Sequence, residues 1–221
     1  MNEEVLIPKM KRIDNTKKSF KIPWLNIAIV VLCILMIIGS TFLNLSIKHY
    51  IIPSSLFSGN QLTSDDFIYG ICFIPQIPVI MFLCSFLGKR MSLVTTLLYI
   101  LLGLFILPVF ALGGGLRYIG EFGFGYILAF IPAIIVAGNQ LESKYSYWNM
   151  IKAAIFGVLI IHFFGILYMI LIALIKHAGG NFMLDWIYAQ SGLKIIYDII
   201  ISFVLILIGK YLHSGLKFIL E

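Results

Sequence analysis

Long apolar runs separated by short polar connections dominate the pattern of this chain. Each run holds about 20 mostly apolar residues, the length that a helix needs to cross the hydrocarbon core of a bilayer. A window of that size predicts six membrane-spanning helices, at approximately 24–46, 67–87, 92–112, 123–141, 150–176 and 193–218. The pattern therefore predicts an all-α, polytopic membrane protein with six transmembrane helices.

The connections between these runs differ in charge from one side to the other. Twelve of the 16 Lys and Arg residues lie in the N-terminal segment, in the connections near 88–91 and 142–149, and around the C-terminus. Positive residues favour the cytoplasmic side. We therefore expect both termini in the cytoplasm, with 1–23 as a basic tail and 24–221 as the six-helix domain. The first run is too long for a signal peptide and is read as an uncleaved helix.

Composition supports the membrane assignment, since 61% of the residues are hydrophobic and 12% are charged. The formal charge of +6 is concentrated in the N-terminal tail, a position more typical of membrane orientation and contact with anionic lipid than of nucleic-acid binding, so we expect no nucleic-acid partner. Cys33, Cys72 and Cys84 lie in apolar runs without metal-ligand spacing. The cytoplasmic membrane is the expected location.

Catalytic motifs are missing from the sequence. It has no phosphate-binding Gly-x-x-x-x-Gly-Lys-Ser/Thr loop, no His-Glu-x-x-His pair and no Gly-x-Ser-x-Gly nucleophile motif. We expect no enzymatic activity, no metal and no cofactor. His162, in the fifth run, is either an interhelical hydrogen-bonding group or a ligand contact.

Polar and helix-breaking residues gather toward the predicted outer half of the bundle. Pro75 and Pro78 flank Gln76, and two prolines so close together predict a bend near the middle of the second span. Asp198 lies a short way into the last span, where a carboxylate needs a partner. Lys194 is one turn earlier on the same face, so the pair either neutralise each other or contact a ligand together.

A glycine-rich loop follows the third predicted span. Gly113, Gly114 and Gly115 allow a tight turn and close approach to another surface, and Arg117 and Tyr118 follow them directly. The guanidinium of Arg117 either reaches lipid headgroups or captures a small anion from outside. Two further outward segments, 48–66 and 177–192, could cover a site. The second has the aromatic pattern of a short helix in the membrane interface.

The block "YILLGLFILPVFALGGGLRYIGEFGFGYILAFIPAIIVAG" (99–138), with "PQIPVIMFLCSFLG" (75–88) before it, resembles the BioY family. Members of that family are the biotin-binding components of energy-coupling factor transporters. The resemblance implies a six-helix fold like that of these substrate-binding (S) components, and biotin uptake through a site in the outer half of the bundle. It also implies that the loop at 113–115 covers the ligand.

The resemblance places Tyr126 at the family's Gly-Tyr pair. Asp198 corresponds to an acidic residue that receives the N–H groups of the ureido ring. A lysine that usually follows this acidic residue is replaced by Ile201, and two upstream polar positions by Ile80 and Phe82. The ligand carboxylate is therefore assigned to Arg117 or Lys194, and Gln76 substitutes for the upstream polar residues.

Partners follow from the same resemblance. Uptake against a gradient would require ATPase subunits and a membrane scaffold subunit. The Ala-x-x-x-Ala face that often contacts the scaffold is absent from the first span, so either Gly39 and Ser40 replace it or the protein works alone or as an oligomer. A carrier for another small vitamin, a membrane scaffold and an intramembrane enzyme remain alternative functions.

Overall fold

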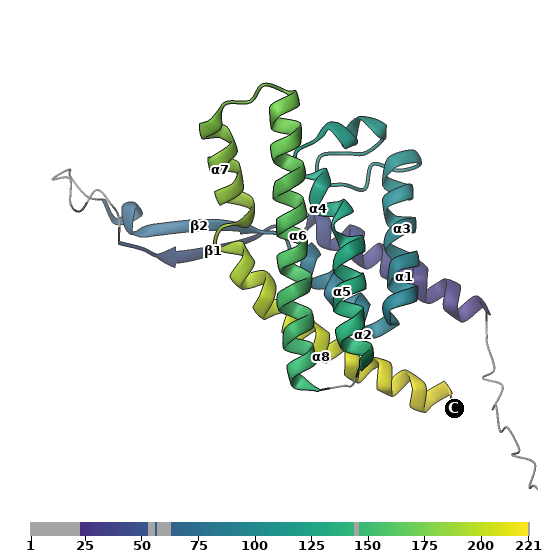
Figure 1. The fold of residues 1–221 in the computed structure, drawn as a ribbon. Helices are drawn as coiled ribbons and strands as arrows, with labels where there is room; N and C mark the ends of the chain where they lie inside the picture. Colours follow the sequence, from purple (N-terminus) through teal and green to yellow (C-terminus); the bar gives the residue numbers. More distant parts are fainter. Residues whose placement is uncertain (1–22, 53–55, 57–62, 144–145, 221) are drawn as a thin grey trace, which may run out of the picture.

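The computed structural model describes residues 23–52, 56, 63–143 and 146–220, and these residues are mostly helical (Figure 1). The helices are α1 (Pro23–Phe42), α2 (Gln76–Leu87), α3 (Lys89–Phe105), α4 (Phe124–Leu128), α5 (Phe130–Ser143), α6 (Tyr147–Ile175), α7 (Gly180–Ser191) and α8 (Lys194–Leu220). Two strands, β1 (Leu45–Tyr50) and β2 (Ile68–Phe73), and two short 3-10 helices, η2 (Ser64–Phe67) and η3 (Leu116–Gly120), complete the described elements. The predicted tail at 1–23 lies almost wholly outside the described residues.

Four described stretches are long and apolar enough to cross a membrane: Trp24–Phe42, Phe124–Glu142, Tyr147–Ile175 and Gly180–Gly215. The helices α2 and α3 are shorter, with 12 and 17 residues. Together these segments correspond in order to the six predicted spans, and the multi-pass membrane character of the chain is confirmed. The crossing of all six and the side of each terminus stay predictions.

A two-stranded sheet replaces helix at two predicted positions. β1 pairs with β2 in antiparallel register, with Leu45 opposite Phe73 and Tyr50 opposite Ile68. The first predicted span therefore ends at Phe42, and the second begins at Gln76 rather than at 67. Apolar composition cannot separate a short strand from a helix, but the β-branched and aromatic residues of these two segments favour strands. In Figure 1 this hairpin projects from the side of the helical bundle.

The predicted proline bend in the middle of the second span is wrong. Pro75 is the N-cap of α2 and Pro78 lies in its first turn. Backbone N–H groups of a first turn have no partner within the helix, so proline there removes no hydrogen bond. The resulting helix is short and is buried over most of its surface, which explains why it is apolar all round.

The third helix occupies Lys89–Phe105 rather than 92–112. Gly88, with a φ of 77°, precedes it, so the predicted turn at 88–91 is largely its first turn. Beyond Phe105 the chain folds back on the helix end. Phe110 and Gly113 exchange two backbone hydrogen bonds of 2.8 and 3.0 Å, and the N–H of Gly115 donates to the carbonyl of Gly103. Pro108 disfavours helix at the residue before it, which accounts for the early end.

The helices α4 and α6 approach closely at two glycines. A Cβ atom on Gly165 would lie 2.6 Å from ring carbons of Tyr126, and one on Gly125 would lie 2.2 Å from the Cβ of Tyr168. Each glycine therefore leaves room for a tyrosine of the facing helix. The Tyr126 ring, packed over Gly165, faces the interior of the bundle, where it becomes part of the site described below.

Replacing Gly165 with alanine is expected to displace the Tyr126 ring and to lower stability by about 1–3 kcal/mol, the usual cost of overpacking a core. Gly39→Ala is the matched control, since nothing lies within 4 Å of a Cβ atom at Gly39. Unfolding of both variants in detergent, followed against temperature or denaturant, measures the difference. Equal stability of the two variants would contradict this packing.

Candidate functional site

The bundle contains a partly open cavity of about 320 Å³, here called the main cavity. Its walls come from the end of β2, the start of α2, the segment from 111 to 123, and the helices α4 to α8. The lining residues are Phe73, Ile74, Gln76, Ile77, Ala111, Leu112, Tyr118, Glu121, Phe122, Gly123, Tyr126, Ile127, Phe130, His162, Trp186, Gln190, Lys194 and Asp198. Mostly apolar and aromatic walls with a few polar groups are typical of a small-molecule site.

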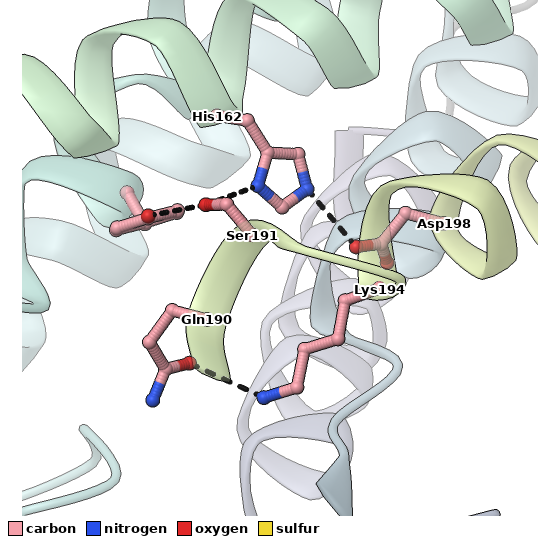
Figure 2. Close-up of polar contacts among 6 residues, drawn as sticks. His162, Gln190, Ser191, Lys194 and Asp198 are labelled. Carbon is pink, nitrogen blue, oxygen red and sulfur yellow. Dashed lines mark hydrogen bonds and ion pairs between the residues drawn. The ribbon is translucent and has the colours of Figure 1, made fainter. Parts of the chain in front are cut away.

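A chain of hydrogen bonds runs along one wall of the main cavity. The carboxylate oxygen Oδ2 of Asp198 lies 3.1 Å from Nε2 of His162, and Nδ1 of His162 lies 2.9 Å from Oγ of Ser191 (Figure 2). Ser191 Oγ lies 2.6 Å from the hydroxyl of Tyr126. The four residues come from α8, α6, α7 and α4, so this chain ties four helices together at the cavity.

Asp198 has one acceptor that the protein leaves unpaired. The residue is 3% exposed, and its second oxygen, Oδ1, has no hydrogen-bond partner among the described residues. An unpaired buried acceptor costs about 1–3 kcal/mol, more when it is charged. Because Asp198 lines the cavity, a ligand that donates a hydrogen bond to Oδ1 would recover that cost.

Lys194 lies one turn before Asp198 and is directed elsewhere. Its Nζ donates to Oε1 of Gln190 over 3.3 Å (Figure 2). No ion pair within 4.0 Å joins Lys194 to Asp198 in the described part of the chain. The two charges therefore do not neutralise each other by direct contact, and both remain at the cavity surface.

Gln76 presents its amide oxygen for contact, because its amide nitrogen is fully used. Nε2 donates to the hydroxyl oxygens of Thr41 and Tyr99, each at 2.9 Å. Thr41 in turn donates to the carbonyl of Ile37. This network fixes the side chain at the first turn of α2, where Gln76 lines the main cavity.

Aromatic contacts hold α7 over the main cavity. The ring of Trp186 lies 5.8 Å from that of Tyr126 and 6.2 Å from that of Phe122, measured between centroids. Ser191 is the buried residue of this helix. Only Gly192 and Leu193 separate α7 from α8. The expected short helix within 177–192 is therefore confirmed as α7, and Trp186 and Gln190 of this helix line the main cavity.

A smaller cavity of about 250 Å³ lies between β2 and the junction of α7 with α8. Gln190 and Lys194 line both cavities. The hydrogen-bonded pair therefore stands at the boundary between the main cavity and this second space.

The glycine loop, Gly113 to Gly115, supports one wall of the main cavity without lining it. Gly113 and Gly115 adopt φ values of 115° and 83°, which favour glycine, and a Cβ on Gly114 would lie 2.7 Å from the carbonyl of Gly103. The packed loop places Tyr118 in the cavity wall, and burial raises the pKa of its phenol. Tyr118 packs against Phe110, at 4.6 Å between ring centroids.

The structure brings together five of the nine predicted site residues. Gln76, Tyr118, Tyr126, Lys194 and Asp198 line the main cavity. The three glycines do not line it but position its wall.

Arg117 is exposed and lies outside the cavity lining. The sequence leaves His162 open between an interhelical hydrogen-bonding group and a ligand contact, and the structure shows interhelical hydrogen bonds from it to Ser191 and Asp198. Ser191, Gln190 and Trp186 are not among the predicted site residues.

Gln190 lies four residues before Lys194, a spacing that can bring two side chains together on one side of a helix, so the sequence could have indicated this pair. Nothing in the sequence around Ser191 indicates that it contacts the site.

Among the described residues, no group of three or more His, Cys, Asp or Glu side chains could hold a metal ion.

Comparison with known proteins gives three matches. A model described as the BioY family matches residues 15–218. A curated protein of Lysinibacillus sphaericus, "Probable biotin transporter BioY", is 36% identical over 92 residues, which are 41% of this chain and 47% of that protein. The aligned part thus spans about half the length of that relative.

A solved structure, the S-component for biotin from an ECF-type ABC transporter, superposes with a TM-score of 0.61. The superposition covers 87% of this chain and 92% of that one at 18% identity. At this identity the likeness shows the fold, which is that of an S-component.

Replacing Gly115 with alanine is expected to strain the glycine loop by about 1–2 kcal/mol, because an L side chain at that φ is unfavourable. The strain would reach Tyr118, whose N–H donates to the carbonyl of Gly115. Gly120→Ala is the control, since Gly120 has no positive φ and open space at its Cβ. Thermal unfolding compares them, and a Gly115→Ala variant as stable as Gly120→Ala would contradict the assignment.

Proposed function

This chain belongs to the BioY family, and we propose that it takes up biotin across the cytoplasmic membrane by capturing it in the main cavity. The observation that carries the proposal is the unpaired Oδ1 of Asp198, a buried acceptor at the wall of a partly open cavity lined mainly by apolar and aromatic residues. The names of the curated relative and of the solved S-component point to the same ligand. The protein binds and transports and is not an enzyme.

Biotin fits the chemistry of the cavity at both of its ends. Its ureido ring carries N–H groups that would donate to Oδ1 of Asp198. Its fused rings and aliphatic chain are apolar enough to pack against Phe122, Tyr126 and Trp186, which line the space. Its carboxylate requires a cation or donor at the far end.

We assign the carboxylate to Lys194 rather than to Arg117. Lys194 lines the main cavity, and its Nζ is held there by Gln190. Arg117 is exposed and lies outside the lining, a position that suits contact with lipid headgroups. The family resemblance leads one to expect a lysine at position 201, about one turn after Asp198. In this chain that residue is Ile201, and we propose that Lys194, one turn before Asp198 on the same helix, takes the role instead.

Enclosure supplies most of the affinity in this proposal. A hydrogen bond to a charged group contributes about 1.5–3 kcal/mol, whereas nanomolar binding requires about 12 kcal/mol. Burial of the ligand's apolar surface contributes about 25 cal/mol for each Å² removed from water. A cavity closed by α7 and by the wall that Tyr118 completes can bury the ligand on several sides.

Energised uptake would depend on partner subunits, an ATPase pair and a membrane scaffold. Of the two residues expected to substitute for the missing small-residue motif, Ser40 is buried and donates to the carbonyl of Ile37. Gly39 has open space around it. We therefore place any close helix contact with a scaffold at Gly39 of α1.

Purified protein is expected to bind radiolabelled biotin saturably, and Asp198→Asn to weaken binding by about 10- to 100-fold through loss of a charge-assisted hydrogen bond. Asp185→Asn is the matched control, because Asp185 is exposed on α7 and lies outside the cavity lining. Equilibrium binding in detergent measures all three proteins. Absence of saturable binding by the wild type would contradict the proposed function.

Lys194→Gln is expected to weaken biotin binding by about tenfold or more, and Arg117→Gln to weaken it less. Biotinamide, which lacks the negative charge, provides the decisive comparison. Its affinity should change little in Lys194→Gln if the ammonium meets the carboxylate. A larger loss in Arg117→Gln, confined to the charged ligand, would assign the carboxylate to Arg117 instead.

A further inference from the structure

The hydrogen-bonded wall from Tyr126 to Asp198 has one direction when Asp198 is a carboxylate and His162 is neutral. A carboxylate only accepts hydrogen bonds, so the proton of a neutral His162 must lie on Nε2 to donate to Asp198. Nδ1 of His162 then accepts from the hydroxyl of Ser191, and Ser191 Oγ accepts from the hydroxyl of Tyr126. Every donor in the chain points toward Asp198.

We propose that His162 and Ser191 are positioning residues that fix Asp198 as an acceptor with one oxygen left for a ligand, and that they make the site selective for ligands carrying N–H donors. The assignment rests on the proposed function, since biotin is the ligand whose N–H groups are in question. His162 holds Oδ2, which leaves Oδ1 as the carboxylate atom without a partner among the described residues. Ser191 orients His162 through its other nitrogen.

The same direction of hydrogen bonding makes Tyr126 an acceptor at the cavity surface. Its single O–H is donated to Ser191, so only the lone pairs of its oxygen remain for a ligand. Asp198 and Tyr126 both line the main cavity. This wall accordingly accepts hydrogen bonds and donates none from these two groups, which matches a ligand edge with N–H groups and disfavours an edge made of acceptors or methyl groups.

Burial makes the hydrogen bonds of His162 and Ser191 costly to break. His162 and Ser191 are each 2% exposed, and both ring nitrogens of His162 are paired. A buried polar group that lost its partner would be costly, so the chain holds together as a unit. Ser191 is also the residue of α7 that takes part in this chain of hydrogen bonds. The cover over the cavity and the orientation of the binding carboxylate therefore depend on the same hydroxyl.

Three substitutions of His162 separate positioning from packing. In His162→Gln the amide nitrogen can reach the place of Nε2 and still donate to Asp198. His162→Asn can reach only the place of Nδ1, and His162→Phe fills the space without any polar atom. Ser191→Ala removes the link between His162 and Tyr126. His213→Asn is the matched control, because His213 contacts the carbonyl of Phe86 and lines neither cavity.

The readout is the ratio of affinities for biotin and for biotin methylated on a ureido nitrogen, measured by equilibrium binding to each purified protein. We expect His162→Asn and His162→Phe to lose about tenfold or more in biotin affinity and most of the wild-type preference for the unmethylated ligand. His162→Gln should retain most of both, Ser191→Ala should be intermediate, and His213→Asn should match the wild type. Thermal unfolding of each variant is recorded in parallel.

The outcomes distinguish this assignment from the function on which it rests. No biotin binding by the wild type overturns the proposed function. Wild-type binding together with an unchanged affinity ratio in His162→Asn and His162→Phe overturns the positioning role and leaves the function standing. A lower unfolding temperature with an unchanged ratio also overturns the positioning role, since it shows that His162 only packs. A loss in His162→Gln as large as in His162→Phe has the same consequence.

Discussion

A carboxylate buried inside a membrane bundle is the constraint around which this site is built. Charge at that depth is expensive, and a helix carrying it must find partners in its neighbours. Asp198 obtains one from His162 of α6, and that histidine in turn requires Ser191 of α7 and, through it, Tyr126 of α4. One oxygen of the carboxylate is paired and the other has no partner among the described residues, and the hydrogen bonds that begin at Asp198 link four helices.

The rest of the fold makes room beside that group. Because α2 is short and begins at its prolines, the space above its first turn is left to Gln76 and to the end of β2. Because α3 ends early, the glycine loop can fold back and insert Tyr118 as a wall. The close approach of α4 to α6 at Gly165 and Gly125 then accommodates Tyr126 in the cavity wall as well. Two of these walls depend on a helix that begins late or ends early, and the third depends on two glycines where helices meet.

Sequence reasoning recovered the long helices and the membrane character, because runs of apolar residues directly reflect the thickness of a bilayer. It missed the hairpin, since Ile68–Phe73 is as apolar as a helix and its pairing partner lies beyond a long connection. Gln76, Lys194 and Asp198 could be selected because polar residues are rare in such runs. Ser191 could not, because a serine near a helix end has many ordinary explanations. Only the distances to His162 and Tyr126 reveal what it contacts.

The two-residue connection between α7 and α8 has a mechanical consequence. Gln190 and Lys194 stand on either side of Gly192 and Leu193, and a hydrogen bond spans that joint. Swinging α7 away from the bundle would turn about this joint, so it would stretch the bond between the two side chains while pulling Ser191 from His162. A movement of α7 away from the bundle would therefore break the Gln190–Lys194 and Ser191–His162 hydrogen bonds together. Entry and release of a ligand past α7 would require the same movement.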